Sequence, residues 1–349
     1  MQFRSLKFCL AYTTPFLVIW SIASENSWSF SAIIFTFVLV PLVELFTKGS
    51  TKNLTKVEEE LAKADPLYDW ILYGLVPLQY FILGFFLFEI SKEGLTIQYQ
   101  IGATLAFGLA CGILGINAAH ELGHRPSKHE QLMSKMLLLT TLYMHFFIEH
   151  NRGHHKNVST DEDPASSKKG EHIYHFYIRS IVDGWWSAWH LETIRLNKQQ
   201  QKFWSIHNEM LVYQLIQGLL VIVIGMLFGI KTLLFFLAGT LMGILLLETV
   251  NYIEHYGLRR KKSGVHYERT MPIHSWNSNH PIGRLLLLEL SRHSDHHYLA
   301  SRKYQTLRHF DESPQMPTGY PGMMVLALIP PLWFNIMHKR INQFQSTIS

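Results

Sequence analysis

Nine histidines in four short motifs are the residues of this chain best suited to metal chemistry. They are found in HELGH, EHNRGHH, NYIEHYG and RHSDHH, as His120, His124, His150, His154, His155, His255, His293, His296 and His297. On a helix, residues four apart lie on one face with their Cβ atoms about 5–6 Å apart. The pairs His120/His124, His150/His154 and His293/His297 can therefore each grip one ion. Nine imidazoles exceed the needs of a single metal and predict two first-row transition ions.

The cysteines of the chain do not form a comparable metal site. The two cysteines, Cys9 and Cys111, lie in apolar runs and form no CxxC pair. A structural zinc takes four ligands, so nine histidines around two ions with open positions favour iron.

Four carboxylates adjoin the histidines: Glu121, Glu149, Glu254 and Asp295. Such neighbours orient imidazoles from outside the coordination shell, ligate directly, or are merely solvated. Trp276 and Asn277, near the last cluster, are candidates for orienting the site or for an electron path.

The elements that must position these histidines are membrane helices. The chain is 48% apolar and 16% charged, whereas soluble domains carry about 25% charged residues. Six apolar runs are each close to the roughly 20 residues that span a bilayer: 8–23, 28–46, 71–90, 101–119, 210–229 and 232–250. The first could be a cleaved signal peptide, but the second follows it so closely that a retained hairpin is favoured. The fold class is therefore all-α integral membrane, with six transmembrane helices.

Basic residues orient these spans. The segment between spans two and three contains Lys48, Lys52, Lys56 and Lys63, while each short connection contains at most one lysine. The positive-inside rule then places both termini and residues 125–209 in the cytoplasm. The formal charge of +5 is attributed to this topology, and no nucleic-acid binding is expected.

Four segments follow from this topology. Residues 1–124 hold spans one to four and end in the first histidine motif. Residues 125–209 form a cytoplasmic segment with the second motif, and residues 210–257 hold spans five and six. Residues 258–349 form a cytoplasmic segment with the last motif and an apolar stretch, 323–337, that is broken by prolines and expected at the interface. All nine histidines then gather on the cytoplasmic side and complete one di-iron site.

These motifs resemble those of the integral-membrane alkane monooxygenases. The likeness includes NYIEHYGL (251–258) and LSRHSDHH (290–297), and extends to TDEDPASS (160–167), HSWNSNH (274–280) and PTGYPGMMVLALIPPLWF (317–334). It implies a non-haem di-iron enzyme of the bacterial inner membrane, with all nine histidines as ligands. The expected reaction inserts one atom of O2 into the terminal C–H bond of a medium-chain n-alkane taken from the bilayer, giving a 1-alkanol. The implied electron donors are rubredoxin and an NAD(P)H-dependent rubredoxin reductase.

Alternatives remain at this point. The xylene monooxygenases share the NYxEHYGL motif, and fatty-acyl hydroxylases or desaturases share the histidine motifs, so either reaction could use the same metals. A histidine-rich metal transporter is disfavoured because transporters bind their cargo near the bilayer midplane, whereas these clusters lie at helix ends. Bulky residues such as Trp28, Phe35 or Phe85 could limit the depth of a substrate cavity. An acidic electron carrier, or anionic lipid, could contact Arg259, Arg260, Lys261, Lys262, Arg302, Lys303 and Arg308.

Overall fold

The computed structural model describes residues 4–348, which are mostly helical and fall into two compact units. The first unit comprises the residues up to Thr36, residues 66–153 and residues 185–247. The second comprises residues 37–65, 154–184 and those from Glu248 onward. Each unit thus collects stretches that are far apart in the chain.

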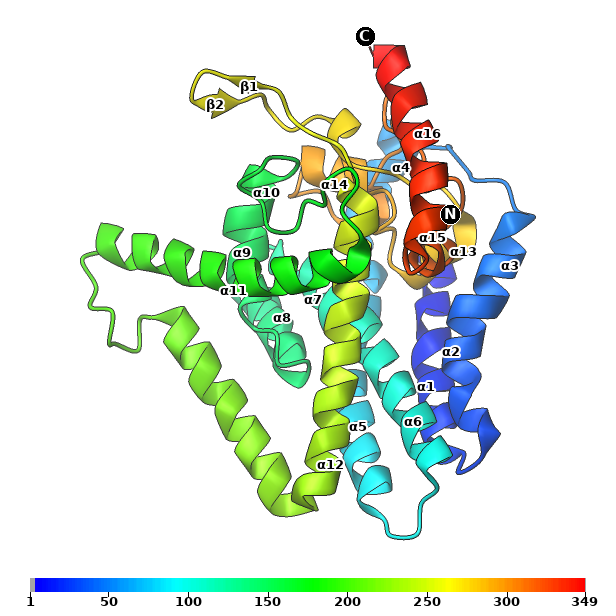
Figure 1. Ribbon diagram of the computed structural model, residues 1–349, viewed down its shortest axis with the longest axis vertical. Helices are drawn as coiled ribbons and strands as arrows, with labels where there is room; N and C mark the ends of the chain where they lie inside the picture. The colour runs from blue at the N-terminus through cyan, green and yellow to red at the C-terminus, as the bar shows by residue number, and fades with distance from the viewer. Residues whose placement is uncertain (1–3, 349) are drawn as a thin grey trace. The chain divides into compact units, whose positions relative to one another are not determined.

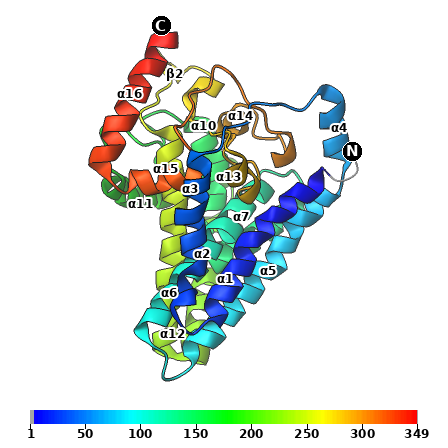
Figure 2. The ribbon, with the colours of Figure 1, turned by 90° about the vertical axis from the view of Figure 1, so that its right-hand side faces the viewer.

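Long apolar helices form the first unit. It contains η1 (Ser5–Tyr12), α1 (Thr13–Ala23), η2 (Ser27–Phe30), α2 (Ser31–Ile34), α5 (Leu67–Ser91), α6 (Ile97–Ala110), the π-helical η4 (Cys111–Asn117), α7 (Ala118–Gly123), α8 (Lys128–Thr140) and α9 (Phe146–Glu149). Helix α1 lies along α5 and α6 (Figure 2). A Cβ atom on Gly243 would clash with the Cβ of Cys111, so glycine allows α12 to approach the start of η4 closely.

Helix α12 (Glu209–His255) is the longest element and is not straight. At Gly229 the backbone leaves the helical region, with φ 78° and ψ 168°. Figure 1 shows the helix folding back into two limbs at its lower end. Because Gly229 has no Cβ, it can adopt this conformation without steric cost. The break coincides with the boundary between the apolar runs 210–229 and 232–250.

Among residues 4–348, five helical stretches are long and apolar enough to cross a membrane: Ser5–Ala23, Ser27–Leu45, Leu67–Ser91, Ile97–Gly123 and Glu209–His255. The last has a mean hydropathy of 2.5, yet only 17% of its most apolar window is buried inside the protein. Apolar surface of this extent is suited to lipid. The chain is therefore a membrane protein, while the division of the last stretch into two spans, making six, stays a prediction.

Shorter elements and irregular segments form most of the second unit. They are α3 (Val40–Leu45), α4 (Lys56–Ala64), α10 (His155–Asn157), β1 (Lys262–Ser263), β2 (His266–Tyr267), η6 (Pro272–His274), α13 (Pro281–Leu286), α14 (His293–Tyr298), η7 (Tyr304–Thr306), α15 (Tyr320–Ala327) and α16 (Pro330–Ile348). Strands β1 and β2 pair antiparallel, with Lys262 opposite Tyr267. The η3 segment (Phe35–Leu39) and α11 (Ile173–Lys198) each contribute residues to both units. The expected interfacial stretch 323–337 is divided between α15 and α16, at Pro330.

Candidate metal centre

Three histidines converge in the first unit. His120 lies on α7, His124 follows at its C-terminal end, and His150 begins the π-helical η5 (His150–His154). The Nε2 atoms of His124 and His150 are 3.0 Å apart. The ring of His120 lies 5.0 Å from that of His124 and 4.5 Å from that of His150, between centroids. The ring of Phe146 stacks on His150 at 4.7 Å. The i,i+4 pairing expected of His120 and His124 is therefore present.

The helical turn that bears His120 and His124 is held from both sides. Ser134 of α8 donates a hydrogen bond of 2.6 Å to the carbonyl of Ala119. Glu121 accepts two hydrogen bonds from the guanidinium of Arg125, at 2.7 and 3.0 Å, and Arg125 also contacts Asp69 at 3.2 Å. Arg125 is only 4% exposed. This buried ion network fixes the end of α7, the helix that bears His120.

Four further histidines converge in the second unit. The ligand nitrogens of His154, His255, His293 and His297 all lie within 4.8 Å of one another. The Nε2 atoms of His154 and His297 are 3.2 Å apart, and those of His255 and His293 are 3.3 Å apart. All four side chains are at most 5% exposed. His255 comes from the last turn of α12, His293 and His297 come from one face of α14, and His154 ends η5.

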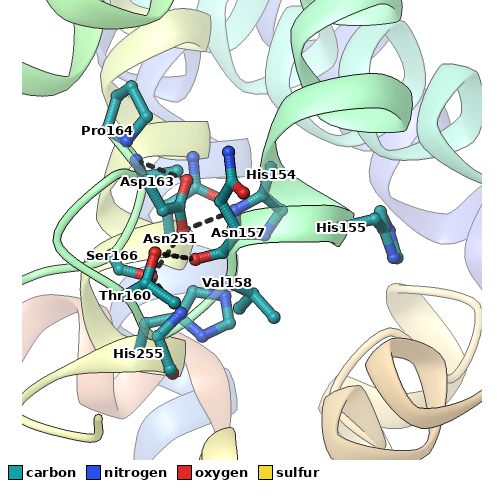
Figure 3. A network of polar contacts seen from close by, with 12 residues as sticks. His154, His155, Asn157, Val158, Thr160, Asp163, Pro164, Ser166, Asn251 and His255 are labelled. Carbon is teal, nitrogen blue, oxygen red and sulfur yellow. Dashed lines mark hydrogen bonds and ion pairs between the residues drawn. The ribbon is translucent and has the colours of Figure 1, made fainter. Parts of the chain in front are cut away.

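The same unit also brings His155 and His296 together, with their Nε2 atoms 3.1 Å apart. The sequence predicts that His150 and His154 grip one ion, because they are four positions apart. In the structure His154 belongs to the four-histidine group, and His150 lies with His120 and His124. The segment is a π-helix, whose wider turn rotates residues four apart away from a common face. Figure 3 shows the rings of His154 and His155 pointing in different directions.

A carboxylate that was not among the candidates from the sequence supports His154. Asp163 Oδ2 lies 2.9 Å from His154 Nδ1 and also accepts a hydrogen bond from the Ser166 hydroxyl (Figure 3). The backbone N–H of Ala165 donates to its other oxygen, at 3.1 Å. Burial alone would raise the pKa of Asp163, but His154 and Ser166 bring it below its usual range. Only the motif TDEDPASS hinted at this residue, since nine positions separate Asp163 from His154.

Glu254 lies close to the nitrogens of the four-histidine group. Its Oε2 is 3.0 Å from Nε2 of His293, and its Oε1 accepts a 2.7 Å hydrogen bond from the hydroxyl of Tyr320. Both side chains are fully buried, with exposures of 1% and 0%. The Glu254 carboxylate therefore lies beside the His293 nitrogen that faces the other imidazoles. Tyr320 fixes the orientation of this carboxylate.

The remaining candidates lie near the histidines but contact other groups. Asp295 accepts two hydrogen bonds from Arg302, at 2.7 and 2.9 Å, and one from the backbone of Arg308. Asn277 Oδ1 accepts from the N–H of Ser294, beside His293. Trp276 donates from its indole to the carbonyl of Tyr256, and its own N–H bonds the carbonyl of Glu254. Glu149 is buried beside Gly153, where a Cβ would lie 2.7 Å from its Oε1.

The four-histidine group has the spacing and chemistry that a metal ion requires. Two ring nitrogens each about 2.1 Å from one ion are about 3.0 Å apart at a right angle and about 3.4 Å apart at the tetrahedral angle. The observed Nε2 separations, 3.2 and 3.3 Å, lie within that range. Burial, and then the neighbouring imidazoles, hold the pKa of His297 well below its usual range. This imidazole is therefore neutral at pH 7 and has a lone pair to offer.

Known proteins are similar to this chain over most of its length. Residues 97–338 match the model of the fatty acid desaturase family. An alkane 1-monooxygenase of Acinetobacter baylyi is 40% identical over 87% of this chain and 74% of its own length. An alkane 1-monooxygenase of Ectopseudomonas oleovorans is 39% identical over 94% and 82%. The chain belongs to the alkane 1-monooxygenase family. The hydroxylase component of a xylene/toluene monooxygenase from Pseudomonas putida is more distant, at 28% identity over 79% of this chain.

In this alkane monooxygenase homologue, the basic residues considered for carrier docking lie in two parts of the second unit, and those around η7 are Arg302, Lys303 and Arg308. Arg302 is paired with Asp295, and Arg308 with Glu59, so both guanidinium groups have ion-pair partners within the second unit. The others on the β1–β2 hairpin and its stem are Arg259, Arg260, Lys261 and Lys262. Of these, Arg260 is tied to the carbonyls of Lys156 and Glu268, while the side chains of Lys261 and Lys262 are exposed.

The bulky residues considered for the substrate cavity are not the most buried ones in the first unit. Trp28 is 65% exposed, and Phe85 is intermediate. The neighbouring Phe86 is fully buried and stacks on Phe107, with 4.3 Å between ring centroids. Phe107 in turn lies 6.0 Å from Phe236 of α12. Phe86, Phe107 and Phe236 thus form a buried aromatic cluster in this unit.

Proposed function

We propose that this protein is a membrane di-iron monooxygenase that converts medium-chain n-alkanes to 1-alkanols. The buried four-histidine group supports this proposal most strongly, because its nitrogens have the spacing of metal ligands within a chain 40% identical to an alkane 1-monooxygenase. The nine histidines together hold two irons, which is consistent with a donor set that contains only imidazoles and neighbouring carboxylates. The bound irons supply O2 activation, which no side chain of the protein can provide.

The protein's own residues position the ligands and the substrate. Asp163 keeps the proton of His154 on Nδ1, so that Nε2 faces the metal position. Tyr320 holds the Glu254 carboxylate beside His293. The apolar spans admit an alkane directly from the bilayer. Because lipid is already apolar, selectivity must come from the shape of the interior and not from hydrophobic transfer. Phe86 and Phe107 are the buried side chains best placed to set that shape.

Electrons come from rubredoxin, which an NAD(P)H-dependent reductase reduces again after each transfer. The protein resides in the bacterial inner membrane with both termini in the cytoplasm. The lysine distribution along the chain supports this orientation. The basic hairpin stem supports an acidic carrier.

One experiment tests the proposal directly. The purified protein is assayed for bound metals, and then supplied with O2, rubredoxin, the reductase and NAD(P)H. Products from a series of n-alkanes, toluene and xylene are identified by gas chromatography. We expect two irons per chain and 1-alkanols as the main products. A single ion per chain, benzylic alcohols as the dominant product, or desaturated products would contradict the proposal. Retention of hydroxylation by His150→Ala or His293→Ala would contradict it as well.

A further inference from the structure

Three oxidisable aromatic side chains form a closed group next to the four-histidine group, within the second unit. Tyr252 lies in the last turn of α12, Tyr256 directly follows His255, and Trp333 lies on α16. The ring centroids of Tyr252 and Tyr256 are 5.2 Å apart, and Trp333 lies 5.3 Å from the first ring and 5.2 Å from the second. All three side chains are fully buried. Each ring is therefore a close neighbour of the other two.

The hydroxyl group of Tyr256 has a base as its partner. Its oxygen lies 2.9 Å from Nε2 of His338 on α16, and it accepts a 2.9 Å hydrogen bond from the backbone N–H of Gly170. Because Gly170 donates to this oxygen, the single phenolic hydrogen is available for His338, whose Nε2 then accepts it. Burial, and then the charge of Lys169, lower the pKa of His338. The imidazole is therefore neutral at pH 7 and can take up a proton.

Tyr256 connects a metal ligand candidate with the protein surface. Its backbone is bonded covalently to His255, and its carbonyl accepts a 2.9 Å hydrogen bond from the indole of Trp276. At the other end of the side chain, the phenolic oxygen contacts His338, which is half-buried, and Gly170, which is exposed. One residue thus separates the four-histidine group from groups that solvent can reach.

A monooxygenase needs an outlet for oxidising power that meets no substrate. When O2 reacts at a metal site without an alkane in place, no substrate C–H bond consumes the oxidising equivalents, and nearby side chains are oxidised instead. Tyrosine and tryptophan lose an electron more readily than the other aromatic residues. A phenol does so most easily when a base takes its proton in the same step. Tyr256 meets both conditions, because His338 is such a base.

We propose that Tyr256, with His338 as its proton acceptor and with Tyr252 and Trp333 as neighbours, is a protective outlet that carries oxidising equivalents from the four-histidine group to the surface. The inference rests on the proposed function, since it requires iron that has reacted with O2. In each event Tyr256 gives one electron to the oxidised site and its phenolic proton to Nε2 of His338, which leaves a neutral tyrosyl radical.

A soluble thiol restores the outlet. Its thiolate gives one electron to the radical and becomes a thiyl radical, while His338 returns the proton to the oxygen of Tyr256. Two such events consume the two oxidising equivalents that hydroxylation of one alkane molecule would have consumed. The protein then returns to its starting state without damage to its histidines.

Two conservative variants test the outlet without changing a proposed metal ligand. Tyr256→Phe keeps the ring and removes the hydroxyl group. His338→Gln keeps a hydrogen-bond acceptor for the phenol and removes the base. Tyr267→Phe, at a tyrosine of β2 whose ring contacts Arg260 and Lys262, is the matched control. Thermal unfolding measures the stability of each variant. If Tyr256→Phe is unstable, the comparison of His338→Gln with the wild type decides.

The radical and the damage are measured separately from hydroxylation. Each iron-loaded protein is reduced and then mixed with O2 in the absence of alkane and thiol. Samples are frozen rapidly, and electron paramagnetic resonance on protein with ring-deuterated tyrosine identifies a tyrosyl radical. Mass spectrometry of peptides that contain residues 251–258 and 290–297 measures oxidation of the histidine motifs.

We expect a tyrosyl radical in the wild type and in Tyr267→Phe, its loss in Tyr256→Phe, and a smaller yield in His338→Gln. Glutathione should abolish the wild-type signal, and the histidine peptides of Tyr256→Phe should be oxidised faster than those of the wild type. Absence of the radical in the wild type, or an unchanged signal in Tyr256→Phe or His338→Gln, would overturn the proposal. If such a result accompanies conversion of octane to 1-octanol by the wild type, the outlet is refuted and the hydroxylase function stands. A wild-type protein that neither binds iron nor forms 1-octanol would refute both.

Discussion

Replacing Asp163 by asparagine isolates the contribution of one buried charge to metal binding. Asparagine keeps the size of the side chain and one oxygen that can accept from His154 Nδ1, now 2.9 Å from the carboxylate. What is lost is the negative charge that makes His154 a better donor. Partners of this kind typically change metal affinity by 10- to 100-fold. This range corresponds to about 1.4–2.7 kcal/mol, so we expect the iron affinity of Asp163→Asn to fall by that amount.

Asp163→Ala should differ in a diagnostic way. Alanine leaves His154, Ser166 and the N–H of Ala165 without their acceptor. Each unsatisfied buried group costs roughly 1–3 kcal/mol. The melting temperature of the metal-free protein should therefore fall further for alanine, which removes all three contacts, than for asparagine, which removes only the acceptor of the Ala165 N–H. Chelator competition measures affinity, and thermal unfolding measures stability. Asp161→Asn is the matched control, because Asp161 lies in the same loop and is exposed. Iron affinity of Asp163→Asn within twofold of wild type would refute the reasoning.

Three further predictions follow from buried side chains. Burial lowers the pKa of His145 to about 4, whereas the pKa of an unfolded histidine is about 6.5. Between pH 6.5 and pH 4, unfolding therefore takes up a proton. The free energy of unfolding should fall by up to about 3 kcal/mol as the pH drops from 6.5 to 4. Thermal unfolding across that range should show a flatter profile for His145→Phe, but not for the exposed control His129→Phe. Phe86→Ala should extend the range of accepted substrates toward longer or bulkier alkanes, measured by gas chromatography of the alcohols formed. The neighbouring Phe85→Ala should change this range little. Tyr320→Phe leaves Glu254 Oε1 without its donor and should lower stability in thermal unfolding by about 1–3 kcal/mol, whereas Tyr174→Phe, whose hydroxyl contact is exposed, should not.

Much of the fold could be predicted from the sequence because its strongest signals are local. Apolar runs of about 20 residues correspond closely to helices: 71–90 lies within Leu67–Ser91, and 101–119 lies within Ile97–Gly123. Gly229 lies where the runs 210–229 and 232–250 meet, and there the backbone of α12 breaks. Hydropathy acts within each segment, so no knowledge of distant contacts is needed.

The histidine motifs could also be recognised from the sequence, because histidine is an uncommon residue and its clustering is visible there. The i,i+4 spacing of His120/His124 and of His293/His297 places each pair on one helical face. The ligand types favoured iron, whereas the association with alkanes came from the resemblance of whole motifs, with which the 40% identity to an alkane 1-monooxygenase agrees.

Tertiary structure decided which groups meet. The separation of His150 from His154 follows from π-helical winding, which the sequence did not signal. Asp163 reaches His154 only because the intervening loop turns back, and Tyr320 reaches Glu254 across 66 positions of the chain. A surface cavity of the second unit, lined in part by His274, likewise combines residues 257–274 with Phe344. Spacing along a chain reports only neighbours within a helical turn, whereas these contacts depend on the packing of segments that are distant in sequence.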